Sequence, residues 1–85
     1  MRLPNSTVEY LTRSLDTNVL ISLKTKSWLR GILRTFDQHL NLIIDDAEEI
    51  VMPNSPGEDH KVIKIGRRVL VRGDNVVAIS ASPRR

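Results

Sequence analysis

The sequence predicts an all-β fold in which a short N-terminal helix precedes five short strands that curl into a barrel. Three observations favour this fold. The chain has 85 residues, which is enough for one domain with a modest core. Apolar residues recur every three or four positions only in the first 15 residues, and from residue 18 onward they alternate with polar ones. Short polar turns between short strands then let one sheet bend until it closes on itself.

A helix is expected at about residues 5–15. Ser6 and Glu9 have the spacing of a capping box, in which Ser6 is the N-cap and the Glu9 side chain returns to it. The helical spacing then gives one apolar stripe, formed by Val8, Leu11 and Leu15. Because a helix of this length is marginal on its own in water, the stripe must pack against the strands.

The first two strands are expected on either side of a short polar connection at residues 24–27. The first begins at Asn18, and the second runs from Trp28 to Asp37. Gly31 interrupts the second strand, and a lone glycine inside a strand indicates a sharp bend or a close approach of another backbone. A small barrel needs such corners, so the glycine fits the predicted fold.

A third strand is expected from Leu40 to Ile50, and it includes the acidic run at residues 45–49. Because side chains alternate between the two faces of a strand, the four carboxylates of this run do not converge on one site. The run is therefore interpreted as a solvated strand end. Residues 51–60 contain two prolines and one glycine, which predicts an exposed, variable loop.

The last part of the chain is expected to hold two more strands. The fourth runs from Lys61 to Arg72, and the pair Gly73-Asp74 predicts a tight turn before a fifth strand at residues 75–80. A basic tail follows at residues 81–85. The last two strands would lie near the opening of the barrel, where an unpaired edge invites a strand of another chain. A head-to-tail contact of this kind closes into a ring when its rotation allows.

The charge is distributed unevenly along a chain whose net charge is +3. Residues 37–60 hold seven acidic residues and no lysine or arginine, whereas residues 61–85 hold seven lysines and arginines and one acidic residue. These segments are either solvated loops or an acidic region beside a basic region that suits a polyanion.

The composition also limits the cellular setting and the chemistry. The chain has no cysteine, which excludes a disulfide framework and a zinc site built on sulfur. It has no apolar stretch of membrane-spanning length and no secretion signal at its N-terminus, so we expect a cytoplasmic protein with no membrane contact. Asp37 and His39 lie two residues apart, but no third histidine or cysteine supports them as metal ligands. We therefore expect that the protein is not an enzyme and that it binds no cofactor and no metal ion.

Two sequence motifs stand in order and are joined by the polar loop at residues 51–60. The first, within residues 18–50, contains Gly31, Leu33, His39 and the pair Asn41-Leu42, and the second, within residues 61–80, contains Ile65-Gly66 and the run from Leu70 to Val77. Together they closely resemble the two motifs of the Sm and Sm-like (Lsm) proteins, in the form seen in archaeal members. The resemblance covers nearly all of residues 8–80.

This resemblance implies a single Sm-like domain over residues 1–85, with a short helix on a five-stranded, strongly bent antiparallel barrel. Sm-like proteins form rings of six or seven subunits, and sevenfold rings are the usual archaeal form. Adjacent subunits pair their fourth and fifth strands. Uridine-rich single-stranded RNA binds around the central pore, with one base for each subunit.

The resemblance also implies roles for individual residues. The His39 ring would stack on a base, the Asn41 amide would complement the edge of uracil, and the Arg72 guanidinium would cover the other face of the base. Asp74 would orient Asn41 through a hydrogen bond, and Asp37 would fix the loop. The implied RNA-binding residues are therefore Asp37, His39, Asn41, Arg72, Gly73 and Asp74.

Two other readings of the same residues remain open. Asp37 and Asn41 are also common turn formers, and Gly73-Asp74 is good turn chemistry in any protein. A ring of this fold could instead serve as a scaffold that docks proteins and binds RNA weakly, with residues 45–49 and the loop at 51–60 as its working surface. If RNA binding is the function, the ring would be an RNA chaperone or a ribonucleoprotein core in RNA processing or turnover, with RNA-processing proteins as further partners.

Overall fold

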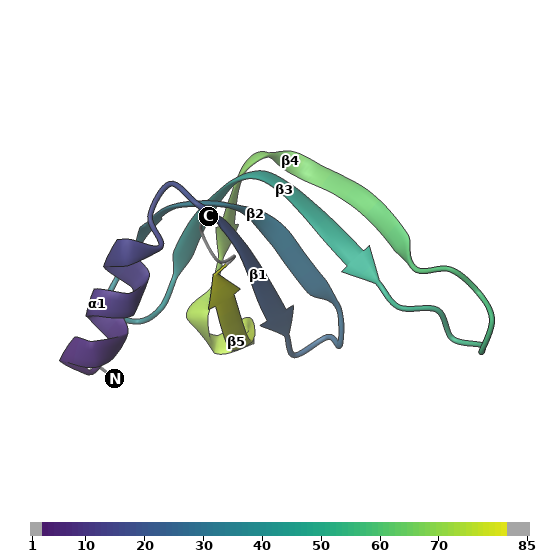
Figure 1. Ribbon diagram of the computed structural model, residues 1–85, viewed down its shortest axis with the longest axis horizontal. Helices are drawn as coiled ribbons and strands as arrows, with labels where there is room; N and C mark the ends of the chain where they lie inside the picture. The colour runs from purple at the N-terminus through teal and green to yellow at the C-terminus, as the bar shows by residue number, and fades with distance from the viewer. Residues whose placement is uncertain (1–2, 82–85) are drawn as a thin grey trace.

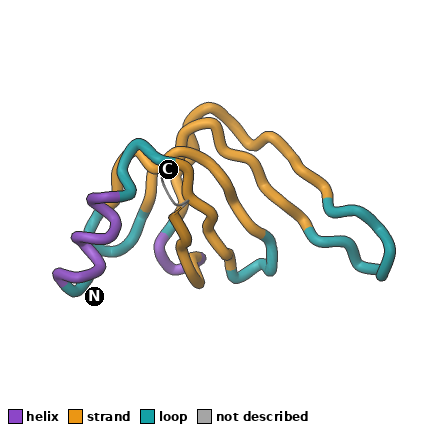
Figure 2. Tube along the Cα trace, in the orientation of Figure 1, coloured by secondary structure: helices purple, strands orange, loops and turns teal. Residues whose placement is uncertain are grey.

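The computed structural model describes residues 3–81, and it confirms one short N-terminal helix and five antiparallel strands in a strongly bent sheet (Figures 1 and 2). A single turn of 3₁₀ helix, η1, lies between the last two strands. The elements are α1 (Asn5–Arg13), β1 (Asn18–Leu23), β2 (Trp28–Phe36), β3 (Leu42–Val51), β4 (Lys61–Val71), η1 (Gly73–Asn75) and β5 (Val76–Ala81). Among the described residues, no helix has the length and apolar character needed to cross a membrane.

The sheet has the strand order β4-β3-β2-β1-β5, and every neighbouring pair is antiparallel. The last two strands are consecutive in the chain but lie at opposite edges of the sheet. The tight turn expected at Gly73-Asp74 exists as η1, but the two strands that it joins do not pair with each other. Both edges therefore keep one row of backbone N–H and C=O groups that no strand within residues 3–81 satisfies.

The bend of the sheet depends on Gly31, as the sequence predicts. A Cβ atom at this position would collide with the Ile44 side chain and would lie 2.8 Å from the carbonyl oxygen of Asp45. The β2–β3 register shifts beside the glycine, between Arg30 and Ile32, as expected where one strand gains a residue over its partner. The arch that β2, β3 and β4 form in Figure 1 follows from this close approach of two backbones.

The core lies under the arch and collects apolar side chains from four strands and from α1. Its buried residues are Leu11, Val19, Ile21, Leu29, Leu33, Leu42, Ile44, Ala47 and Val71. Leu11 is the buried member of the helical stripe, while Val8 and Leu15 are half-buried beside it. The predicted stripe thus attaches α1 to the sheet.

The predicted capping box is wrong. The helix begins one residue before the expected cap, with Pro4 as N-cap, and no side chain caps it. The carbonyl oxygen of Pro4 accepts the first helical hydrogen bond from the Val8 N–H at 3.1 Å, so Ser6 already lies inside the first turn. The helix also ends at Arg13 and not at Leu15, and the chain then passes through Asp16 with a φ of 62°, a conformation that ends a helix.

The acidic run of β3 is only partly solvated, which corrects the interpretation given above. The Asp45 side chain is 11% exposed, and it accepts hydrogen bonds from Arg34 Nε at 2.7 Å and from Arg68 Nε at 2.8 Å. Arg34 also reaches Asp16, at 2.7 Å. The hydrogen bonds from the Arg68 and Arg34 guanidinium groups hold the pKa of Asp45 far below its usual range. This cluster joins β2, β3 and β4 beside the bend.

Candidate nucleic-acid interface

The loop between β2 and β3 is held by the carboxylate of Asp37. One carboxylate oxygen accepts the backbone N–H of His39 at 2.8 Å and that of Asn41 at 3.0 Å, and the other accepts the Asn41 side-chain amide at 3.0 Å. The backbone of Asp37 adds two bonds, from Leu40 N–H to its carbonyl oxygen and from its own N–H to the Asn41 carbonyl oxygen, both 3.1 Å. Asp37 therefore fixes this loop, as expected.

These hydrogen bonds favour the charged form of Asp37. The side-chain amide of Asn41 and then its backbone N–H lower the pKa of the Asp37 carboxyl group below its usual range. The carboxylate consequently remains an acceptor for all three N–H groups at neutral pH. The shape of the loop therefore does not depend on a partner molecule.

The turn η1 packs directly against this loop, although the two lie about thirty residues apart in sequence. The backbone N–H of Gly73 donates to the side-chain oxygen of Asn41 at 2.7 Å. A Cβ atom at Gly73 would collide with the carbonyl oxygen of His39 and would lie 3.0 Å from the carbonyl carbon of Leu40. Only glycine lets the two backbones approach this closely.

Asp74 does not orient Asn41, contrary to the expectation. The amide of Asn41 already bonds to Asp37 and Gly73, and these two bonds fix which end of the amide is the oxygen. The Asp74 carboxylate lies instead 3.8 Å from Arg72 Nε, and both side chains are about 70% exposed. Such an exposed pair contributes little to stability.

The remaining polar groups of the site face solvent. The side chains of His39 and Arg72 are exposed, while Asn41 is half-buried. The Asn41 amide uses one N–H and one lone pair inside the protein, which leaves one donor and one acceptor free. The structure thus brings Asp37, Asn41 and Gly73 into contact and places the other predicted residues directly beside them.

One residue of this site was missed in the sequence. Leu40 lies between His39 and Asn41 with a φ of 66°, in the left-handed region that a leucine rarely adopts. This conformation also delays the start of β3 from the expected Leu40 to Leu42. The only signal in the sequence was an apolar residue inside a polar turn.

The described residues hold no group of three or more histidine, cysteine, aspartate or glutamate side chains that could bind a metal ion. The site therefore consists of hydrogen-bonding and planar groups. An exposed imidazole ring and an exposed guanidinium group, each next in the chain to the fixed loop or turn, together with the fixed amide of Asn41, suit the face and the edge of an unpaired base.

The comparisons with known proteins agree with this description. The model of the LSM domain family matches residues 9–81. A relative from Aeropyrum pernix is 43% identical over 74 residues, which is 87% of this chain and 86% of the relative. Among solved structures, the Sm protein of Pyrococcus abyssii in complex with a uridine heptamer is 41% identical and has a TM-score of 0.73, with 88% of this chain and 96% of that chain covered. The SmAP1 heptamer of P. aerophilum is 41% identical and has a TM-score of 0.78, with 95% and 99% covered.

The two motifs, the bent five-stranded sheet and the match to the family model all agree over nearly the whole described chain. The chain belongs to the LSM domain family and has the fold of the archaeal Sm proteins.

Proposed function

We propose that this chain is one Sm-like domain that assembles into a homomeric ring of seven and binds uridine-rich single-stranded RNA in the cytoplasm, without catalysing a reaction. The observation that carries the proposal is the Asn41 amide, which is held by Asp37 and Gly73 and still has one free donor and one free acceptor. The complex of the Pyrococcus abyssii Sm protein with a uridine heptamer supports it.

The fixed amide explains a preference for uracil. Uracil presents an N–H donor beside a carbonyl acceptor, whereas cytosine presents a ring-nitrogen acceptor beside an amino donor. A freely rotating asparagine could match either edge by exchanging its oxygen and its nitrogen. Because Gly73 holds the oxygen and Asp37 holds the nitrogen, the Asn41 amide offers one arrangement only. The rejected base leaves polar groups unpaired, and this is the physical basis of discrimination.

Stacking supplies the affinity that a single amide lacks. His39 and Arg72 are exposed next to Asn41 and Gly73, so a base on the amide lies within reach of an imidazole ring and a guanidinium plane. Stacking of this kind contributes about 1–3 kcal/mol for each base. A single pocket of this strength is weak, and a ring would combine its pockets on one strand through effective concentration.

The ring itself is supported by the two open edges of the sheet. Large apolar side chains are exposed along the edge strands, and they are Val62, Ile63, Ile65, Leu70 and Val77. Pairing β4 of one copy with β5 of the next would satisfy both backbone edges and cover these side chains. Two solved archaeal Sm proteins of the same fold are heptamers: one is 44% identical to this chain, and the other is the P. aerophilum protein.

The test compares the binding of labelled heptauridine, heptacytidine and heptaadenosine at two salt concentrations, and light scattering measures the mass of the protein in solution. We expect a sevenfold species that prefers uridine and binds less tightly as salt rises, because phosphate contacts release counterions. Asn41→Ala should abolish the uridine preference and leave the mass unchanged. The matched control is Asn18→Ala, an exposed asparagine at the start of β1.

Unchanged uridine preference in Asn41→Ala would overturn the assigned pocket. A wild-type ring with no nucleotide preference would overturn the proposed function and would favour a protein-docking scaffold. With RNA binding in place, the ring would act as an RNA chaperone or a ribonucleoprotein core in RNA processing or turnover, with RNA-processing proteins as further partners.

A further inference from the structure

We propose that Leu40 is a positioning residue for the uridine pocket and that it makes the packing of helix α1 a part of base recognition. This inference rests on the proposed function, because it concerns how the same pocket is held in its binding shape. Leu40 contacts no base in the proposal. It acts through its two neighbours, His39 and Asn41.

The backbone of Leu40 is strained. Its φ of 66° brings the Cβ atom of an L-residue close to the carbonyl group of the preceding residue, and glycine is the residue that adopts this conformation without steric cost. A strained conformation of this kind persists only when the surrounding structure holds it. A leucine at this position must therefore provide something that a glycine cannot, and the only difference is its side chain.

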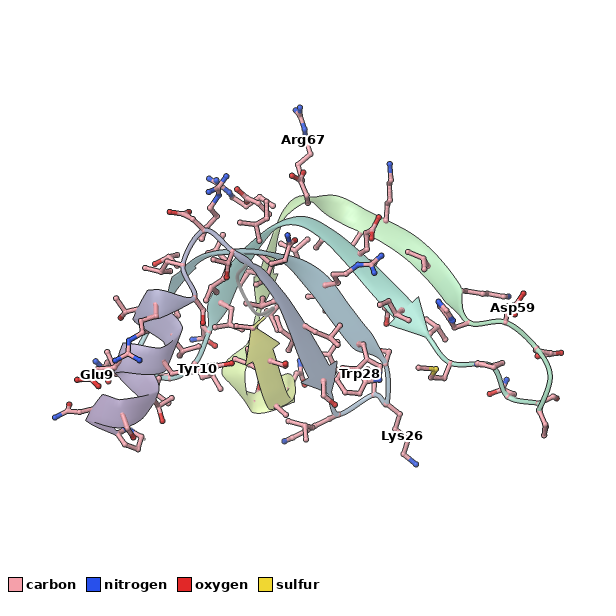
Figure 3. All side chains as sticks on the ribbon, in the orientation of Figure 1. Glu9, Tyr10, Lys26, Trp28, Asp59 and Arg67 are labelled. Carbon is pink, nitrogen blue, oxygen red and sulfur yellow. The ribbon has the colours of Figure 1, made fainter. Side chains whose placement is uncertain are left out.

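The side chain of Leu40 anchors the loop to the rest of the protein. It is half-buried and packs against the core. It also lines a hollow between the helix and the last strand, together with Tyr10 and Leu11 of α1 and Ile79 of β5. Figure 3 shows Tyr10 extending from α1 toward β5, where its hydroxyl oxygen accepts the Ala81 N–H at 2.9 Å. The anchor therefore sits in the joint that attaches the helix to the sheet.

The anchored backbone brings the groups of the pocket together. With Leu40 in the left-handed region, the N–H groups of His39 and Asn41 on either side of it reach the same carboxylate oxygen of Asp37. The same conformation places the Leu40 carbonyl group against Gly73. Without the anchor, only the hydrogen bonds to Asp37 and Gly73 would hold this backbone, and any residue that they leave mobile would be ordered on RNA binding. Each residue ordered on binding lowers the equilibrium constant by roughly 5- to 30-fold.

The test removes the anchor without adding strain. Leu40→Gly keeps the left-handed backbone accessible and deletes the side chain, whereas Leu40→Met keeps an apolar side chain of similar volume. The control is Leu15→Ala, a half-buried leucine that packs against the same core from the segment after α1. For each variant we would measure the mass in solution, thermal stability, affinity for heptauridine and heptacytidine, and hydrogen exchange of the Gly73 amide.

We expect Leu40→Gly to retain the ring but to bind heptauridine roughly 5- to 30-fold less tightly. Its ratio of heptauridine to heptacytidine affinity should be smaller than that of the wild type, and its Gly73 amide hydrogen should exchange faster with solvent. Leu40→Met should restore all of these properties. Leu15→Ala should lose thermal stability with little change in base preference.

Wild-type affinity and base preference in Leu40→Gly would overturn the inference, as would an equal loss of preference in Leu15→Ala. These results are distinct from a failure of the proposed function, in which the wild-type ring itself would show no uridine preference. The exchange rate of the Gly73 amide needs no RNA, so unchanged protection in Leu40→Gly would overturn the inference in that case also.

Discussion

The substitution Gly73→Ala tests the contact between η1 and the loop at residues 37–41 most directly. The added methyl group would meet the carbonyl groups of His39 and Leu40, which are backbone atoms and cannot rotate away. Overpacking of this kind costs about 1–3 kcal/mol. If η1 moves to relieve it, the 2.7 Å hydrogen bond from Gly73 to Asn41 is lost, at a net cost of about 0.5–1.5 kcal/mol.

The displacement should affect base preference more than affinity for RNA in general. With its oxygen released, the Asn41 amide is held by Asp37 alone, so the arrangement that matches cytosine becomes less unfavourable than in the wild type. The loss of about 1 kcal/mol in each pocket corresponds to roughly a fivefold loss of discrimination at each base. Fluorescence anisotropy with labelled heptauridine and heptacytidine measures this ratio, and light scattering shows whether the ring is retained.

Gly66→Ala is the matched control, because a Cβ atom at this position would meet only the Val69 side chain at an ordinary 3.6 Å. This variant should keep both the affinity and the preference of the wild type. A Gly73→Ala ring with the wild-type ratio of uridine to cytidine affinity would refute the reasoning, since the close approach would then have no part in recognition.

The structure makes three further predictions. Gly31→Ala should lower the free energy of unfolding by about 1–3 kcal/mol, because the added Cβ atom would collide with backbone atoms of β3. A melting temperature equal to that of the wild type would contradict this prediction. The contribution of Asp45 to stability should be fully present above about pH 4, the unfolded-state pKa, and should be lost as the pH falls toward the lowered folded-state pKa. The melting temperature of the wild type should therefore fall more steeply with decreasing pH than that of Asp45→Asn. Arg72→Ala should weaken heptauridine binding by about 1–3 kcal/mol for each base engaged, because the guanidinium plane no longer covers the base, and the control Arg13→Ala, on the last turn of α1, should bind heptauridine as the wild type does.

The order and type of the elements could be predicted from the sequence because they depend on local patterns. Helical spacing before residue 16 and alternation after residue 18 are set by which side chains face the core, whatever the partner element is. Gly31 indicated the bend from the sequence alone, because a glycine inside a strand usually marks a bulge, a bend or a close approach of another backbone. The capping box at Ser6 failed because Pro4 starts the helix earlier, and short-range pairs of this kind compete with one another within one turn.

The candidate site likewise has features that the sequence predicts and features that it does not. The types of residue at positions 39, 41, 72 and 73 could be recognised in the sequence, because their chemistry resembles that of a known family. Their connections could not. The choice of Asp37 over Asp74 as the partner of Asn41, and the burial of Asp45 between two arginines, depend on which side chains meet after the sheet has bent.

The sequence by itself thus determined the fold class, the positions of the strands and the residue types of the site, because each of these depends on spacing along a few neighbouring residues. Only the tertiary structure decided the left-handed conformation of Leu40 and the hydrogen bond from Gly73 to Asn41. Leu40 packs against the core and lines the hollow between α1 and β5, two elements that lie far from it in sequence. A strained backbone conformation persists only when contacts with distant residues outweigh its conformational free energy cost, and these contacts cannot be predicted from the neighbouring residues in the sequence.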